Sequence, residues 1–229
     1  MYAFFDVDGT LLSFKSMFSF QEFFYRWEGQ AAGEARWKDF RERFAAWARE
    51  GRDRLFLNRE FYRSFLGRST QAVRAAAEEW FSHERRRPGL LIAPTLQALR
   101  AHQARGQVPV FVSGSLMEIL APVARELGVE HCLATRLEVH QGRYTGALEG
   151  GQVIGQGKAE ALHAFLARQS ASAAECFAYG DDLTDVPMLE AVGHPVAVIG
   201  DTRLAEHARR HRWRMLTVEA EPGAAACAS

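Results

Sequence analysis

The alternation of short apolar runs with helical segments after residue 88 constrains the fold of this chain most. The apolar runs typical of strands cover residues 108–112, 176–179 and 196–199. The segments typical of helices cover residues 116–127, 158–168, 185–191 and 202–210. Strands that alternate with helices predict an α/β fold, a doubly wound parallel sheet covered on both faces.

Further elements complete this sheet. Residues 2–7, YAFFDV, predict a buried first strand, and residues 214–218 predict a last one. A helix over 94–105 is indicated by Pro94 near its start and by Gly106 just beyond its end. Residues 132–148 alternate around Gln141 and Gly142, which suggests a hairpin, and Pro122 is expected to kink or divide the helix over 116–127.

Residues 13–87 have a different sequence pattern. Aromatic residues recur at helical spacing, and four glycines mark breaks, which together predict about four helices: the glycines are Gly29, Gly33, Gly51 and Gly67. We therefore expect an inserted helical domain over residues 14–87. The core domain is expected to combine residues 1–13 with 88–218, and residues 219–229 to be a disordered tail.

Composition excludes several classes of protein. The chain has 28 basic and 28 acidic residues, so no net charge attracts nucleic acid or an anionic membrane. No run approaches the roughly 18 apolar residues of a membrane helix. The first 14 residues carry acids and no basic leader, and three scattered cysteines do not make a disulfide framework: Cys132, Cys176 and Cys227. These features predict a cytoplasmic protein, either a monomer or a homodimer.

Polar residues gather where the predicted strands end, and parallel strands bring such ends to one crevice. They are Asp6, Asp8 and Thr10 after the first strand, Ser113 and Gly114 after the second, Lys158 at the start of a helix, and Asp181, Asp182 and Asp185 after a later strand. Crowded carboxylates repel one another, so a cation must hold them, and oxygen ligands favour Mg²⁺.

Glycine loops and a lysine beside Mg²⁺ make a site for a phosphoryl group. One carboxylate can then act as a nucleophile and form an aspartyl-phosphate, while a second carboxyl two residues later gives and takes protons. Lys158 supports this interpretation. It opens a helix, where the helix dipole disfavours a cation by about 0.3–1 kcal/mol, so its position indicates a function.

At this point the residues resemble a known family. Asp6-x-Asp8-Gly9-Thr10, Ser113, Lys158 and Gly180-Asp181-Asp182-x-x-Asp185 match, in order, the four motifs of the haloacid dehalogenase superfamily. The helical insert is similar to that superfamily's C1 cap and places the chain near the phosphoserine-phosphatase-like subfamily IB. The resemblance spans residues 1–217 and implies a phosphatase that acts on a small phosphorylated metabolite.

The resemblance also implies a role for each matching residue. Asp6 would be the nucleophile and a Mg²⁺ ligand, and Asp8 the general acid and base, with its backbone carbonyl on the metal. Asp181 would be the third ligand, while Asp185 would act through water and cap the helix that follows. The phosphoryl group would be held by Ser113, the Gly114 amide and Lys158, with Thr10 supporting the loop. Asp182 is expected to be a solvated loop acid.

The insert departs from the phosphoserine phosphatase pattern. Lys15 stands where those enzymes have a glutamate that meets the substrate's amino group, and a cation there repels an ammonium. No arginine clearly takes the place of their carboxylate-binding one; Arg59 and Arg63 are near, and Tyr62 occupies that position. We therefore expect another phosphomonoester, such as a sugar, nucleotide or polyol phosphate, with Lys15 in its binding site.

Four apolar residues follow the first motif closely and are candidates for lining the pocket. Phe14 and Met17 are its better candidates, whereas Phe18 and Phe20 are expected to pack in the insert's core.

Two alternative activities stay open, and other kinds of site are excluded or less favoured. A phosphotransferase or mutase would use the same aspartyl-phosphate, and phosphoserine phosphatase remains a second possibility. A P-loop is excluded because Gln152 and Ala159 stand at two of its required positions, and Ser113 lacks a nucleophile-elbow sequence. His207 and His211 have metal-ligand spacing, but no third ligand is evident, so an exposed arginine-rich helix is favoured.

Overall fold

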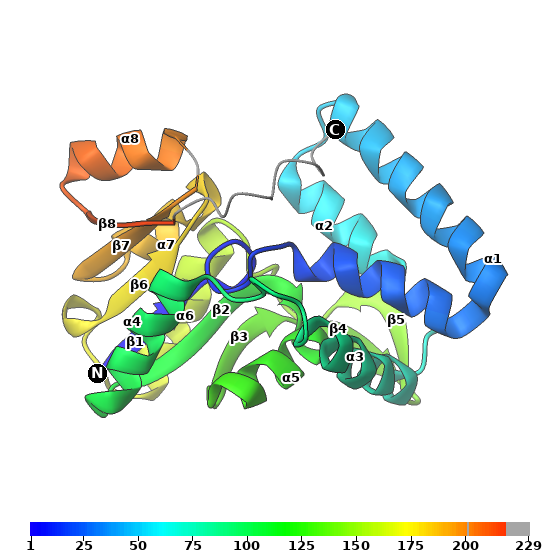
Figure 1. Cartoon of the computed structure of the whole chain (residues 1–229), viewed down its shortest axis with the longest axis horizontal. Coiled ribbons are helices and arrows are strands. Elements are labelled where there is room, and N and C mark those ends of the chain that lie inside the picture. Colours follow the sequence, from blue (N-terminus) through cyan, green and yellow to red (C-terminus); the bar gives the residue numbers. More distant parts are fainter. Residues whose placement is uncertain (201, 219–229) are drawn as a thin grey trace.

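The computed structural model describes residues 1–200 and 202–218, and in them six strands pair in parallel in the order β3-β2-β1-β6-β7-β8 (Figure 1). The predicted α/β fold with a doubly wound parallel sheet is confirmed. The strands are β1 (Tyr2–Phe5), β2 (Val108–Leu116), β3 (His131–Thr135), β6 (Phe177–Gly180), β7 (His194–Ile199) and β8 (Arg214–Thr217). The tail over residues 219–229, Cys227 included, lies outside the described residues.

Successive side chains of the central strands enter two different cores. In β1, Phe5 packs in the core on one face of the sheet and Phe4 in the core on the other. In β2, Phe111 joins the first core, whereas Val110 and Val112 join the second. Because side chains alternate across a strand, a strand covered on both faces must be apolar at every position, which is the pattern the sequence has.

Helices cover both faces of the sheet. α4 (Ala93–Ala104) and α5 (Met117–Leu127) contribute to the core that contains Phe5. The core that contains Phe4 is completed by α6 (Gln156–Arg168), α7 (Val186–Glu190) and α8 (Thr202–His211). Two short 3₁₀ helices, η1 (Ala173–Glu175) and η2 (Leu183–Asp185), flank β6. The prediction that Pro122 divides a helix is wrong, because α5 runs through this buried proline.

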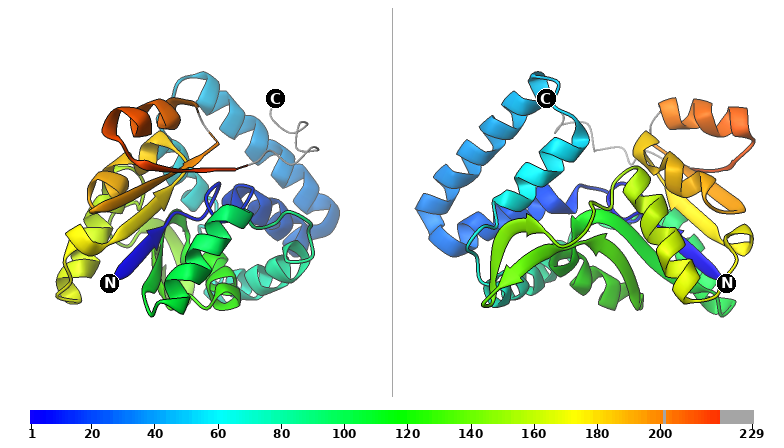
Figure 2. Two further views of the ribbon diagram at one scale, coloured as in Figure 1. Left: turned by 60° about the vertical axis from the view of Figure 1, so that its left-hand side comes forward. Right: turned by 180° about the vertical axis from the view of Figure 1, so that it is seen from behind.

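The predicted hairpin is confirmed in its second part. β4 (Leu137–His140) and β5 (Arg143–Leu148) pair antiparallel, and the turn residues Gln141 and Gly142 have φ of 48° and 74°, as a type I′ turn requires. The alternation before residue 136 belongs instead to β3 of the main sheet. The hairpin packs against the helical insert, where the Gly67 amide donates to the Tyr144 carbonyl at 2.8 Å (Figure 2).

The insert contains three helices where about four were expected. They are α1 (Ser16–Arg49), α2 (Arg54–Arg63) and α3 (Thr70–Glu84). α1 turns back on itself, as the two blue rods in Figure 1 show. The rings of Phe18 and Phe44 lie 5.0 Å apart, whereas 26 residues of straight helix span about 39 Å. The helix break predicted near Gly29 and Gly33 therefore occurs as a bend within one helix.

Gly33 allows that bend. A Cβ atom at Gly33 would lie 1.9 Å from the carbonyl oxygen of Tyr25, which is backbone and cannot swing away. A Cβ at Gly29 would meet only the Nη2 atom of Arg36, the end of a flexible side chain, at 2.5 Å. The close approach of the two halves of α1 thus requires glycine at 33 but not at 29.

Aromatic side chains hold the insert together. Phe20 packs against the rings of Phe24, Phe65 and Trp80, with centroids 5.6, 6.3 and 5.8 Å away. These residues are buried and belong to the same core as Phe5 of β1. In spite of these aromatics, none of the described helices has the length and apolar character that a membrane crossing needs.

We predict that Gly33→Ala lowers the free energy of unfolding by about 1–3 kcal/mol, because the added methyl group forces the α1 bend to open. Gly29→Ala is the matched control and should be neutral or stabilise by up to about 1 kcal/mol. Chemical denaturation of both variants checks this. Equal effects of the two substitutions would contradict the assignment of the bend to Gly33.

Candidate active site

The loop after β1 carries the first acidic residues of the site. Gly9 has φ of +95°, and a Cβ there would lie 2.3 Å from Oδ2 of Asp181, so glycine lets the loop pass beside that carboxylate. The Thr10 hydroxyl, which is buried, donates to Asp181 Oδ1 at 2.9 Å and lies 3.5 Å from Asp6 Oδ2. Thr10 therefore ties the ends of β1 and β6 together.

Lys158 bridges two of the acids. It lies in the first turn of α6, is 4% exposed, and its Nζ donates to Asp6 Oδ1 and to Asp185 Oδ1, both at 2.6 Å. Burial acts to raise the pKa of Asp6, but the charge and hydrogen bond of Lys158 outweigh it and hold that pKa below its ordinary value. Burial acts to lower the pKa of Lys158, but the two carboxylates raise it, so the lysine stays charged.

Asp185 positions the loop after β6. Its Oδ2 accepts hydrogen bonds from the amides of Asp181 and Asp182, at 3.0 and 3.1 Å, while Oδ1 accepts from Lys158. The prediction that Asp185 caps the following helix is wrong, since its side chain makes no capping hydrogen bond to α7. The amides it binds are at the start of η2 instead, because the loop curls back over its carboxylate.

The acids outnumber the cations that face them. Asp6, Asp181 and Asp185 each offer a carboxylate oxygen, and these three atoms lie within 4.8 Å of one another. Burial, with the adjacent Asp6 carboxylate, raises the pKa of Asp181 to about 7. A hard divalent cation would relieve this repulsion, so the donor set, which is all oxygen, fits Mg²⁺.

Asp8 has a carboxyl oxygen available. Its Oδ1 atom is buried and has no hydrogen-bond partner among the described residues. Burial raises the pKa of Asp8 to about 6, and Asp6 adds to the shift while Ser16 and Lys15 oppose it. The Asp8 backbone carbonyl accepts a hydrogen bond from Lys15 Nζ at 2.6 Å. The Lys15 ammonium thus contacts the same backbone oxygen that the family resemblance assigns to the metal.

A cavity of about 280 Å³ opens beside these residues. One wall comes from the ends of the sheet and carries Asp6, Asp8, Ser113, Gly114 and Lys158. The opposite wall comes from the insert and carries Lys15, Met17, Phe18, Phe44, Arg54, Leu57 and Asn58. The structure thus brings the residues predicted from all four strand-end motifs to one place, between the sheet and the insert.

Some predicted pocket residues lie elsewhere. Phe14 packs against Trp80, with ring centroids 6.4 Å apart, and does not line the cavity, whereas Phe18 does. Arg59 and Arg63 are exposed and do not line it either. Tyr62 is buried, and its hydroxyl donates to the Gly114 carbonyl. These differences arise because the rotation of each insert helix decides which face meets the sheet.

Sequence reasoning missed the residues of α2 that line the cavity, among them two polar ones, Arg54 and Asn58. Arg54 lies 3.5 Å from Asp182 Oδ2, so Asp182 has an ion-pair partner in the insert. Asn58 is buried, donates to the Gly114 carbonyl at 3.4 Å and accepts from Gln152 at 3.0 Å. Their spacing of four residues places both on one face of a helix, a signal that was available in the sequence.

The geometry of the site agrees with a family match. The family model described as haloacid dehalogenase-like hydrolase matches residues 3–190. The chain belongs to this hydrolase family. The family predicted from the four motifs is therefore confirmed.

Relatives of this hydrolase extend the comparison. A probable phosphatase of Mycobacterium tuberculosis is 40% identical over 128 residues, which are 56% of this chain and 44% of that protein. The chain thus matches less than half of that relative's length. A phosphoserine phosphatase of the same organism is 29% identical to this chain, in an alignment that covers 93% of this chain and 69% of that protein. A crystal structure of a protein with unknown function from Bordetella pertussis superposes with a TM-score of 0.83 at 30% identity, covering 94% of this chain and 97% of that one.

We predict that Lys158→Met lowers the free energy of unfolding by about 3 kcal/mol in EDTA, because it leaves two buried carboxylates without their cation. Lys38→Met is the control, since Lys38 is exposed and its ion pair is with exposed Glu42 on its own helix. Urea denaturation at neutral pH measures both. A loss no larger than that of the control would contradict the bridging role of Lys158.

Proposed function

We propose that this hydrolase is a Mg²⁺-dependent phosphatase that cleaves a small phosphomonoester through an aspartyl-phosphate on Asp6. The observation that carries the proposal is the cluster at the sheet edge. Lys158 holds Asp6 in its charged form, and an Asp181 oxygen lies within 4.8 Å of an Asp6 oxygen, close enough to share a cation. Asp8 presents an oxygen with no hydrogen-bond partner in the part of the chain that the structure describes. A charged carboxylate nucleophile, a lysine and a divalent cation are the groups that phosphoryl transfer through an aspartyl-phosphate needs.

In the first step an Asp6 carboxylate oxygen forms a bond to phosphorus, and the bond from phosphorus to the ester oxygen breaks. The Asp8 carboxyl gives its proton to that oxygen, so an alcohol leaves. Lys158, the Ser113 hydroxyl and the Gly114 amide hold the phosphoryl oxygens. Bound Mg²⁺, held by Asp6, Asp181 and the Asp8 carbonyl, would neutralise charge on the phosphoryl group.

In the second step Asp8, now a carboxylate, takes a proton from water as the water oxygen attacks phosphorus. Asp6 is released unchanged, and inorganic phosphate is the product. Asp185 does not contact the phosphoryl group in this scheme. Its two oxygens hold Lys158 and the amides of the loop that carries Asp181, which keeps both groups in position.

The insert, residues 14–87, is proposed to act as a cap over a core of residues 1–13 and 88–218. The cavity between them supports this division, because its two walls come from these two parts of the chain. The Ser16 and Ser115 hydroxyls lie 3.2 Å apart and join the start of α1 to β2. Closing the cap would exclude water from the first step.

The leaving group is proposed to be a polar alcohol other than serine. Lys15 and Arg54 put two cations at the cavity, while Met17, Phe18, Phe44 and Leu57 add an apolar surface. Hydroxyls of a sugar, nucleotide or polyol phosphate can accept from these cations, whereas the ammonium of phosphoserine would face Lys15. Phosphoserine stays the second candidate, because relatives of this chain are named phosphoserine phosphatase.

We predict release of inorganic phosphate from at least one member of a panel of phosphorylated metabolites when Mg²⁺ is present. EDTA should lower the rate by at least about 100-fold, because the metal supplies several kcal/mol of transition-state stabilisation. Asp6→Asn should reduce the rate to background, and Asp8→Asn by about 10²–10⁴-fold. A near-normal rate for Asp6→Asn would overturn the proposal, and a rate that depends on an added acceptor alcohol would favour transfer over hydrolysis.

We predict that Lys15→Glu shifts selectivity toward phosphoserine. The ratio of kcat/KM for phosphoserine to that for the best panel substrate should rise by about tenfold or more, which corresponds to about 1.4 kcal/mol from one reversed charge contact. Lys15→Met, which removes the charge without reversing it, should give an intermediate ratio. Phosphoserine as the preferred substrate of the unmodified chain, or an unchanged ratio in Lys15→Glu, would contradict the substrate proposal.

A further inference from the structure

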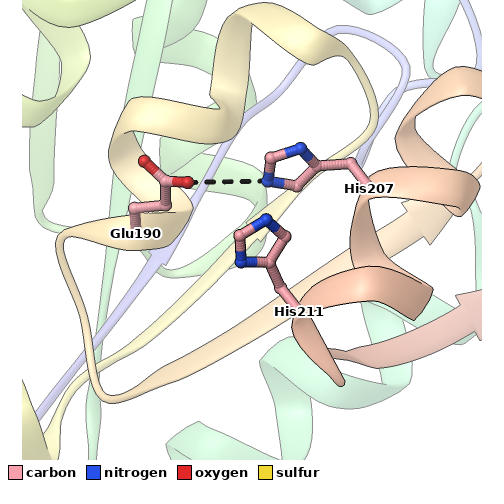
Figure 3. A group of neighbouring side chains, drawn as sticks. All are labelled: Glu190, His207 and His211. Atoms are coloured by element: carbon pink, nitrogen blue, oxygen red, sulfur yellow. Dashed lines mark ion pairs between the residues drawn. The ribbon is translucent and has the colours of Figure 1, made fainter.

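A second group of metal-binding side chains lies away from the aspartate cluster. Glu190 is the last residue of α7, and His207 and His211 lie one turn apart on α8, so the three side chains converge from two helices (Figure 3). One ligand atom from each lies within 4.8 Å of the other two. The expectation that these histidines lack a third ligand is wrong, because Glu190 reaches them across 17 residues of chain.

The geometry is close to that of a bound ion. His207 Nε2 lies 3.5 Å from Glu190 Oε1, and the two imidazole rings lie 4.3 Å apart with only 16° between their planes. Ligand atoms around a tetrahedral zinc are about 3.3 Å apart, from bond lengths near 2.0–2.1 Å. The side chains therefore need to close by about 1.5 Å at most, which the exposed positions of Glu190 and His211 permit.

His207 has a nitrogen that makes no hydrogen bond within the described part of the chain. Its Nε2 atom is buried, and its ion-pair contact with the Glu190 carboxylate, at 3.5 Å, is not a hydrogen bond. A buried polar atom without a hydrogen bond is unfavourable, and a metal ion between the two groups would satisfy both. His211 ends α8, and the carbonyls at a helix C-terminus also favour a cation.

The donor set selects the kind of ion. Two imidazoles and one carboxylate suit Zn²⁺ and similar transition metals, whereas the aspartate cluster, with oxygen donors alone, suits Mg²⁺. Three protein ligands leave a coordination position for water. Trp213 packs beside both rings, with centroids 4.9 Å from His207 and 5.7 Å from His211, and closes one side of the group.

We propose that Glu190, His207 and His211 form a second metal site that takes Zn²⁺ or a related transition-metal ion. The site joins α7 to α8 on the face of the sheet whose core contains Phe4. Residues 185 and 190 are at opposite ends of α7, so the proposed site and the aspartate cluster are distinct. The proposal does not depend on the phosphatase activity.

Calorimetric titration of Zn²⁺ into the untagged chain, first stripped of transition metals, tests the proposal. Excess Mg²⁺ is present to occupy the aspartate cluster. His211→Ala and His207→Ala should each remove one equivalent of bound Zn²⁺. Glu190→Gln should weaken that equivalent by at least the roughly tenfold that losing even an outer partner of a metal ligand causes. His163→Ala, which removes an exposed histidine from α6, is the control and should bind as the unmodified chain does.

A second readout uses Trp213. Ni²⁺ at the site should quench the fluorescence of this residue, and Trp213→Phe should abolish the Ni²⁺-dependent change. Should His207→Ala unfold, as circular dichroism would reveal, His211→Ala decides, because His211 is exposed. Unchanged Zn²⁺ stoichiometry and affinity in the folded histidine variant would overturn the proposal.

Discussion

The hydrogen bonds of the Lys158 ammonium to Asp6 and Asp185 connect the three parts of the molecule that make the site. Asp6 follows β1, Asp185 follows β6, and Lys158 starts α6, so one charged group fixes two strand ends and one helix. All three side chains are buried. Buried charges persist only when they are paired and hydrogen-bonded, and here two loop amides complete the hydrogen bonding of Asp185. The arrangement of the loops around the cavity depends on this interaction.

Much of this arrangement could be predicted from the sequence. Apolar runs bounded by glycine and aspartate marked the strands, because buried parallel strands need apolar side chains at each position. Parallel strand ends meet at one edge of a sheet, so the sequence predicts that Asp6, Ser113, Lys158 and Asp181 lie together. Each of these residues lies next to a strand or a helix that the surrounding sequence predicts. Local sequence patterns were therefore sufficient to place them.

Other features depend on contacts between distant residues. The bend of α1 requires the approach of Gly33 to the Tyr25 carbonyl, and nothing in the sequence distinguishes Gly33 from Gly29. The cavity wall depends on the rotation of α2, which brings Arg54 and Asn58 inward and leaves Arg59 outside. The position of Glu190 beside His207 depends on how α7 and α8 pack on the sheet. Such orientations follow from side-chain packing over many residues, and periodicity alone does not determine them.

A crystal structure grown with Mg²⁺ and beryllium trifluoride, which mimics a phosphoryl group on a carboxylate, tests the central claim most directly. The account predicts beryllium trifluoride on an Asp6 oxygen and one Mg²⁺ at about 2.0–2.1 Å from Asp6, Asp181 and the Asp8 carbonyl. Lys158 should contact a fluorine atom while it keeps Asp185. Beryllium trifluoride on another residue, or Mg²⁺ bound away from Asp6 and Asp181, would contradict the account.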